Sequence, residues 1–188
     1  HKLTLDKAHD IAGNEDGDER FYTSRSIDKK KNPLPYELKL DHLKRMFPEH
    51  AEKWDEDENV RTLIGSAKKA HQDGYKKFHF VGGGDRKDGI LNLLRKYDGQ
   101  QYDFDGQIYG HNAGDRDLDD PISQISASKQ RKFAQDNDFD SFNEGILNHK
   151  GYTERDAKEL FNLVQALMRG EDPDSNKVRD QYKQGDLF

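Results

Sequence analysis

The sequence contains no cysteine, which excludes disulfide bonds and thiolate metal sites. No apolar run approaches the roughly 18 residues that a membrane-spanning helix needs, and no stretch is typical of a signal peptide. An excess of positive charge is also missing, since 31 Lys and Arg stand against 37 Asp and Glu. These absences predict a soluble protein and disfavour a general nucleic-acid coat or a binder of anionic membranes.

Apolar residues are scarce, but their arrangement is periodic. Hydrophobic residues make up 31% of the chain and charged residues 36%. Because the apolar residues gather in regular clusters, wholesale disorder is excluded. A chain of 188 residues is long enough for one domain with its own core. We expect one domain over residues 1–170 and a polar tail or linker over residues 171–188.

Helical and strand-like stretches alternate along the chain. Helices are expected where apolar residues recur at helical spacing or a capping residue opens the stretch, at residues 3–12, 35–47, 59–73, 88–99, 127–136, 138–147 and 153–170. Short strands are expected at residues 19–26, 75–81 and 104–113. This order predicts an α/β fold, a Rossmann-like three-layer α/β/α sandwich with a parallel sheet. Such sheets bind ligands beyond the carboxyl ends of their strands.

Three glycines, residues 82–84, end the second expected strand. Because glycine has no Cβ, a ligand can approach the backbone at Gly83 and Gly84, and Asp85 can accept a hydrogen bond from a ribose hydroxyl. The segment is not a Walker loop and lacks the full dinucleotide fingerprint. The same residues also fit a flexible turn in which Asp85 is the N-cap of the next helix.

The segment Ile125–Arg131, "ISASKQR", combines hydroxyls and cations at the start of an expected helix. Ser126 or Ser128 can cap the helix, whose dipole and backbone N–H groups favour an anion. Lys129 and Arg131 add charge-assisted hydrogen bonds, so the segment suits a polyphosphate. The alternative is a capped helix with solvated cations.

A run of lysines that ends at Lys31 follows the first expected strand. Such a run is usually solvated surface, but at the end of a strand it can also neutralise phosphates in a shared cleft.

Other kinds of site find little support in the sequence. Acidic patches at residues 14–18, 115–119 and 136–140 lack the glycine and the glutamate of an EF-hand loop. The histidines show no zinc-type pairing, and most are expected at the surface. Ser126 and Ser128 have no base evident in the sequence, so no nucleophilic triad is predicted. We therefore expect no dedicated metal site, with the alternative that the patch at residues 115–119 touches a metal ion bound by a nucleotide.

The order of these motifs closely resembles phage-encoded cytidylyltransferase-like proteins of the nucleotidyltransferase superfamily, relatives of pantetheine-phosphate and nicotinamide-mononucleotide adenylyltransferases. The resemblance covers the chain to about residue 147 and, more loosely, its remainder. Its most specific part is Ile125–Arg131, which resembles the Ile-Ser-Ser-Thr-x-x-Arg element with Ala127 and Ser128 in the third and fourth places. The "GGDR" turn resembles Gly-Ser-Asp-Arg, with Gly84 in the place of serine.

The resemblance implies transfer of a nucleotidyl group from ATP or CTP to a phosphate-bearing small molecule, with Mg²⁺ accompanying the nucleoside triphosphate. It implies that Lys129 and Arg131 hold phosphates and that His1, as the last histidine of a His-x-Gly-His motif, polarises the transferring group. The remaining residues implied to bind nucleotide or phosphate are Gly83, Gly84, Asp85, Ser126, Ser128 and Lys31.

The family pattern has further parts that this sequence does not contain. We expect a first strand and a Gly-Arg-Phe-x-Pro loop before His1 in the intact protein, or another segment in the place of that strand, and a small β domain after residue 188. The alternative is a shortened relative of the family. The alternative function is an inactive relative, either a nucleotide-binding module or a virion component. The resemblance places the protein in the cytoplasm of an infected bacterium or in the virion, with a homo-oligomer or virion proteins as further partners. No nucleic-acid or membrane partner is expected.

Overall fold

The computed structural model describes residues 2–114, 125–146 and 151–171, with only the backbone for residues 84–86. It combines helices with a small parallel sheet of two strands, so the expected α/β class is confirmed. The chain divides into two compact units. Unit 1 comprises His1–Tyr22 and Asp55–Asp115, and unit 2 comprises Thr23–Trp54 and Arg116–Phe188. Each unit is therefore built from two separate stretches of chain.

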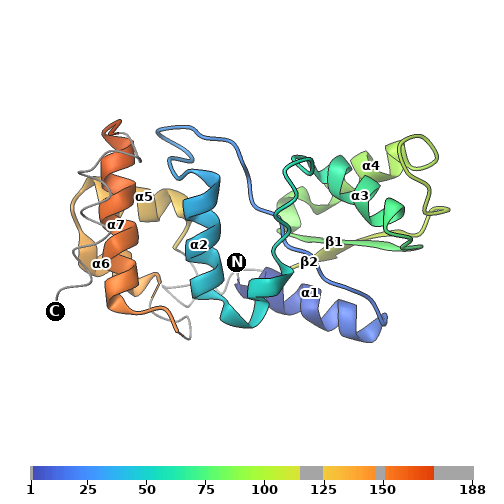
Figure 1. Cartoon of the computed structure of the whole chain (residues 1–188), viewed down its shortest axis with the longest axis horizontal. Helices are drawn as coiled ribbons and strands as arrows, with labels where there is room; N and C mark the ends of the chain where they lie inside the picture. Colours follow the sequence, from blue (N-terminus) through green and yellow to red (C-terminus); the bar gives the residue numbers. More distant parts are fainter. Residues whose placement is uncertain (1, 115–124, 147–150, 172–188) are drawn as a thin grey trace. The chain divides into compact units, whose positions relative to one another are not determined.

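Unit 1 contains the sheet. Its elements are α1 (Lys2–Asn14), α3 (Leu63–Gln72), β1 (Phe78–Gly82), α4 (Gly84–Tyr97) and β2 (Ile108–Asn112). The strands pair in parallel, with Phe78 opposite Ile108 and Gly82 opposite Asn112. Helix α4 connects the strands and packs on both, as a parallel pair requires. Helix α1 contacts β1, and it lies on the opposite side of the strands from α3 and α4 (Figure 1).

The core of unit 1 lies between the sheet and helices α3 and α4. Leu94, Phe104 and Ile108 are fully buried there, together with Ala67 and Tyr102. The Tyr102 hydroxyl donates a hydrogen bond of 2.7 Å to the carbonyl of Leu94, so its burial leaves no polar group unpaired. This core fixes the two strands and therefore the turn between β1 and α4.

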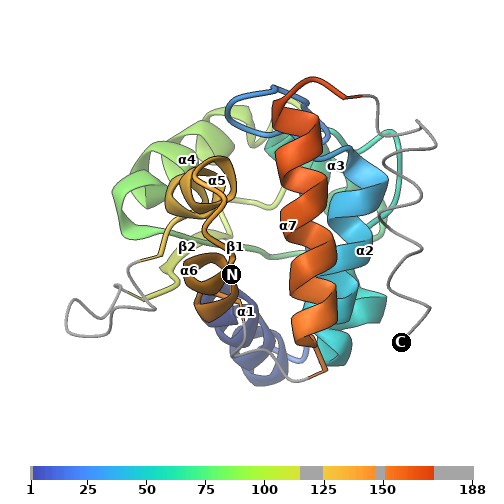
Figure 2. The same cartoon turned by 90° about the vertical axis from the view of Figure 1, so that its left-hand side faces the viewer.

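Unit 2 is helical in its described part. Its elements are α2 (Tyr36–Met46), the 3-10 helix η1 (Pro48–Lys53), α5 (Ala127–Gln135), α6 (Phe139–Glu144) and α7 (Glu154–Met168). Helix α7 packs against α5 and α6, and in Figures 1 and 2 it runs beside α2. The expected inward residues of α7 are all buried: Leu160, Leu163, Val164 and Leu167. Leu34 and Leu38 pack against this stripe.

Several local signals in the sequence are confirmed at helix ends. Gly74 follows α3 with a φ of +94°, a conformation that glycine adopts without a Cβ clash. Thr153 caps α7 in a capping box, in which its hydroxyl accepts from the N–H of Asp156 and the Asp156 carboxylate accepts from the N–H of Thr153. Ser126 caps α5.

The strand expected at Glu19–Ser26 was predicted wrongly, because these residues form no strand of the described sheet. Side chains instead hydrogen bond to the carbonyls that a neighbouring strand would use. The Asn32 amide donates to the carbonyl of Ser26, and Lys39 Nζ donates to that of Ser24 at 2.6 Å. Serine and asparagine side chains often compete with sheet hydrogen bonds in this way.

Two further expectations concern the whole chain. Among the described helices, none combines the length and the apolar character needed to cross a membrane. Most of the tail expected at residues 171–188 lies outside the described residues, as does the acidic patch at residues 115–119. The chain divides into two compact units, and the single domain expected over residues 1–170 stays a prediction.

Candidate functional site

The first turn of α5 presents hydroxyls and cations, as the sequence predicts. Ser126 Oγ accepts a hydrogen bond of 3.2 Å from the N–H of Lys129 and so caps the helix. Arg131 Nη2 donates to Ser128 Oγ at 3.0 Å, which holds the guanidinium beside the helix start. Ser128 and Lys129 are exposed, whereas Ser126 and Arg131 are partly buried. The four predicted side chains of this segment therefore lie together at the start of α5.

The electrostatics of this turn favour an anion. Helix geometry leaves the N–H groups of Ala127 and Ser128 without an intrahelical acceptor. The first turn contains no acidic residue, so the positive end of the helix dipole is not compensated within it. Lys129 and Arg131 add two positive charges. Hydroxyl and cationic side chains suit phosphate oxygens, whereas a bare Mg²⁺ ion needs oxygen ligands without neighbouring cations.

Packing anchors α5 on its other face. Ala134 is fully buried in the core of unit 2, and Gln130 Nε2 donates to the carbonyl of Phe142 at 3.2 Å. Gly145 allows this approach, because a Cβ at that position would collide with the Gln130 amide and touch Ile125 at 3.0 Å. The core thus holds the helix so that its first turn stays accessible.

The glycine turn lies in unit 1, at the carboxyl end of β1. Gly83 is exposed and is the N-cap of α4, which begins at Gly84. The alternative with Asp85 as the N-cap is therefore wrong, because Asp85 already lies in the first turn of α4. The side chain of Asp85 lies outside the described part of the structure.

The first glycine of the run is explained by packing. A Cβ at Gly82 would lie 2.6 Å from Cζ of the Phe80 ring, and that ring packs into the core of unit 1. The packing of the Phe80 ring therefore accounts for the lack of a side chain at Gly82.

Lys31 belongs to unit 2, on a closed turn rather than at the end of a strand. The Asp28 carboxylate accepts from the N–H groups of Lys30 and Lys31 at 2.9 and 2.7 Å, and these bonds lower the pKa of Asp28. Lys31 is exposed. His1, which the resemblance implies to be catalytic, lies outside the described residues. The predicted site residues are thus divided between the two units.

The expectation of surface histidines is wrong for His42 and His50, which are 2% and 5% exposed. His42 Nδ1 lies 2.5 Å from the Tyr152 hydroxyl, so its ring polarity is satisfied inside unit 2. Burial, together with the charge of Arg45, lowers the pKa of His42 to about 3. No local pattern in the sequence indicates this contact, because His42 and Tyr152 are 110 residues apart.

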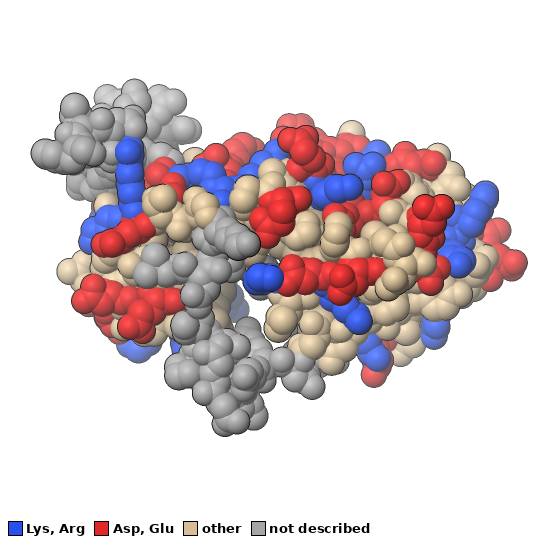
Figure 3. Space-filling model, turned by 90° about the horizontal axis from the view of Figure 1, so that it is seen from below, with Lys and Arg blue, Asp and Glu red and all other residues tan. Residues whose placement is uncertain are grey.

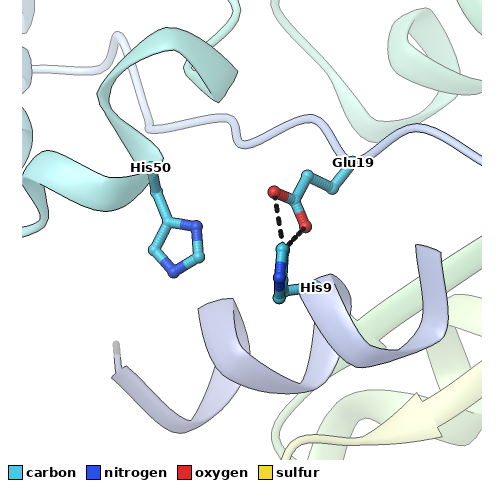
Figure 4. A group of neighbouring side chains, drawn as sticks. All are labelled: His9, Glu19 and His50. Carbon is cyan, nitrogen blue, oxygen red and sulfur yellow. Dashed lines mark hydrogen bonds and ion pairs between the residues drawn. The ribbon is translucent and has the colours of Figure 1, made fainter. Parts of the chain in front are cut away.

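Unit 1 contains two polar pairs that the sequence analysis missed. His9 Nδ1 lies 3.0 and 3.2 Å from the two carboxylate oxygens of Glu19, whose side chain is buried (Figure 4). His79 Nδ1 on β1 lies 3.0 Å from His111 Nε2 on β2. Only the strand register could have indicated the second pair, since its members are 32 residues apart.

Comparisons with protein families, with curated proteins and with solved structures found no match to this chain. Fold and site together define an α/β protein with a small parallel sheet and a cationic helix start.

Proposed function

We propose that this protein is a nucleotidyltransferase that transfers a nucleotidyl group from ATP or CTP to a phosphate-bearing small molecule and releases pyrophosphate. The observation that carries the proposal is the first turn of α5. There the Ser126 cap, Lys129 and Arg131 surround the positive end of a helix dipole that no acidic residue of the turn offsets. A polyphosphate matches this arrangement in charge and in hydrogen-bond acceptors.

The connection of β1 through α4 to β2 supports the same function. Two parallel strands joined by a helix form the unit from which Rossmann-like sheets are built. We propose that unit 1 belongs to such a three-layer sandwich. Ligands bind such sheets beyond the carboxyl ends of the strands, where Gly83 and Gly84 follow β1. The same glycines leave the backbone open to a ligand at this strand end.

In the proposed reaction a phosphate oxygen of the acceptor attacks the α-phosphorus of the triphosphate. The new P–O bond forms as the bond between the α-phosphorus and the bridging oxygen breaks, and pyrophosphate leaves. Lys129 and Arg131 hold the β- and γ-phosphates, Lys31 adds charge and His1 polarises the transferring group. When bound, Mg²⁺ supplies further charge neutralisation on the triphosphate. The protein thus contributes position and charge rather than a covalent nucleophile.

Thermal unfolding with ATP or CTP in the presence of Mg²⁺ tests the site. We expect the nucleotide to stabilise the fold by about 2.7 kcal/mol at a concentration one hundred times its dissociation constant. Replacing both Lys129 and Arg131 by Ala should abolish this stabilisation, because two charge-assisted contacts are lost. Lys132→Ala is the matched control, since Lys132 lies on the same helix and pairs with Asp136 at 2.7 Å. It should leave the stabilisation unchanged.

A nucleotide effect that survives in the double variant would contradict the site. Release of pyrophosphate with a phosphate-bearing acceptor then distinguishes an enzyme from a relative that only binds. Stabilisation without pyrophosphate release would favour the nucleotide-binding module, and no stabilisation together with copurification with particles would favour the virion component.

The charge distribution fits a small anionic ligand better than a nucleic acid. The net charge is −6, and basic and acidic side chains are interspersed on the face shown in Figure 3. A nucleic-acid surface typically concentrates lysine and arginine in one patch or stripe. We therefore propose a small-molecule acceptor.

A further inference from the structure

His79 and His111 lie on the same face of the two-stranded sheet in unit 1. His79 is opposite Tyr109 in the register, and residues two apart on a strand share a face, which puts His111 beside them. His79 Nδ1 is 3.0 Å from His111 Nε2, and the ring planes differ by only 7°. The two nearly parallel rings have their centroids 5.1 Å apart. The Tyr109 ring, 4.8 Å from that of His79, packs against the pair.

Both imidazoles are partly buried and have charged neighbours. Burial lowers the pKa of His79, and the neighbouring His111 adds to this effect. Burial also lowers the pKa of His111, with further contributions from Lys7 and Lys87. Glu15 acts in the opposite direction on both rings, but it does not outweigh these causes.

We propose that His79 and His111 together bind one divalent transition-metal ion of the Zn²⁺ or Cu²⁺ class. An ion about 2.0–2.1 Å from each nitrogen in tetrahedral geometry separates the two nitrogens by about 3.3 Å. The observed separation of 3.0 Å is close to this value, so the strands need not move. A rotation of the rings about their own side-chain bonds turns both lone pairs toward one ion, and histidine rings have broad torsional freedom there.

Metal-free protein holds the pair by a hydrogen bond in which one ring donates and the other accepts. Metal binding requires both facing nitrogens to be unprotonated, so the donating ring moves its proton to its other nitrogen. His79 then carries its proton on Nε2 and His111 on Nδ1, and both rings stay neutral. Water completes the coordination of the ion.

The class of ion follows from the ligands. Imidazole nitrogen suits Zn²⁺, Cu²⁺ and Ni²⁺, whereas Mg²⁺ and Ca²⁺ require oxygen ligands. The site is therefore distinct from the Mg²⁺ that would accompany a nucleotide. It also depends on different residues, so failure of one proposal leaves the other standing.

Isothermal titration of the full chain with ZnCl₂, after treatment with a chelator, tests the site. We expect one Zn²⁺ per chain at this site, unaffected by excess Mg²⁺. His79→Gln and His111→Gln should each weaken its binding by about tenfold or more, since each removes half of the protein ligands. His71→Gln is the matched control: His71 is also partly buried in unit 1 but packs edge-on against Phe104. It should bind Zn²⁺ as the unmodified chain does.

A substitution that restores a ligand distinguishes coordination from a structural role. The chain has no cysteine, so His111→Cys introduces a single thiolate ligand. We expect this variant to bind Co²⁺ with a thiolate charge-transfer absorption that His79→Gln in the same background abolishes. Circular dichroism without metal checks that each variant is folded. Zn²⁺ binding that is absent, or that is equal in the unmodified chain and in folded His79→Gln and His111→Gln variants, would overturn the proposal.

Discussion

Arg45 joins α2 to α7 in unit 2 through several charged contacts. Its Nη1 donates to Asp156 at 2.5 Å and to Glu159 at 3.1 Å, and its Nη2 lies 2.9 Å from Asp41. Burial raises the pKa of Glu159 despite the hydrogen bond from Arg45. Burial also acts to raise the pKa of Asp156, but hydrogen bonds from Thr153 and the charge of Arg45 outweigh it and lower that pKa. The guanidinium thus compensates the carboxylates of Asp156 and Glu159, whose side chains are largely removed from water.

Replacing Arg45 with Met should lower the free energy of unfolding by about 2 kcal/mol. The expected cost lies between that of an exposed ion pair, below about 1 kcal/mol, and that of a broken buried pair, about 3–5 kcal/mol. The side chains of Arg45 and Glu159 are 29% and 16% exposed, which places the pair between these limits. Urea denaturation gives the value. Lys132→Ala, which removes an exposed pair with Asp136, should cost under about 0.5 kcal/mol. Equal costs for both variants would contradict this ranking.

At the scale of elements, Gly82 shows how a strand end depends on a neighbouring ring. Side chains two residues apart share a face, so a Cβ at Gly82 meets Phe80. Gly89, within α4, differs in that a Cβ there has nothing within 4 Å. The same substitution should therefore have opposite effects at the two glycines.

Gly82→Ala should destabilise the protein by about 1–2 kcal/mol, because the Phe80 ring must leave its packed position. Gly89→Ala should stabilise it by about 0.5–1 kcal/mol, because alanine has the better helix propensity and Cβ lies in open space. Chemical denaturation of both variants measures the contrast. Combining Gly82→Ala with Phe80→Leu should recover part of the loss, and strict additivity of the two substitutions would argue against the predicted clash.

Most elements could be predicted because their signals are local. Apolar spacing found the stripe on α7, and capping residues such as Thr153 and Ser126 marked helix starts. The strand expected at Glu19–Ser26 was a wrong prediction. Its aromatic residues are typical of a strand, but the carbonyl of Ser26 accepts a hydrogen bond from the side chain of Asn32 and not from a neighbouring strand. Such a bond depends on the path of the following loop, which the strand residues do not encode.

The candidate site shows the same limit. The hydroxyls and cations of α5 lie within six consecutive residues, so their proximity follows from helix geometry. The pair His79 and His111 depends on the register of two strands, and the burial of His42 depends on a distant tyrosine. Sequence reasoning could place each of these histidines on an element but could not find its partner.

Both units contain histidines whose pKa values are lowered. They are His42 in unit 2 and His79 and His111 in unit 1, and burial is the largest cause for each. The pKa of His42 falls to about 3, far below the value of about 6.5 for an unfolded chain. Below pH 6.5 the unfolded chain therefore binds protons that the folded chain does not. The stability contributed by neutral histidine is present above pH 6.5 and is lost as the pH falls.

We expect the free energy of unfolding to decrease between pH 6.5 and pH 5, with His42 contributing up to about 1.4 kcal/mol per pH unit. His79 and His111 should contribute less, since both rings are partly exposed. Urea denaturation at constant ionic strength measures the slope for unit 2. His42→Gln should reduce this slope by an amount that corresponds to close to one bound proton. An unchanged slope would show that His42 does not titrate in this range.

The division of the chain into units also sets the order in which they can form during synthesis. All described elements of unit 1 are complete once residue 114 has been made. Helix α2 of unit 2 is made early, but its partners on α7 are more than 100 residues later, as the separation of 114 between Arg45 and Glu159 shows. At ordinary ribosome speeds this gap lasts of the order of ten seconds. During that time the apolar face of α2 has no α7 to cover it, so a nascent chain paused within this interval is the form most exposed to chaperones and proteases.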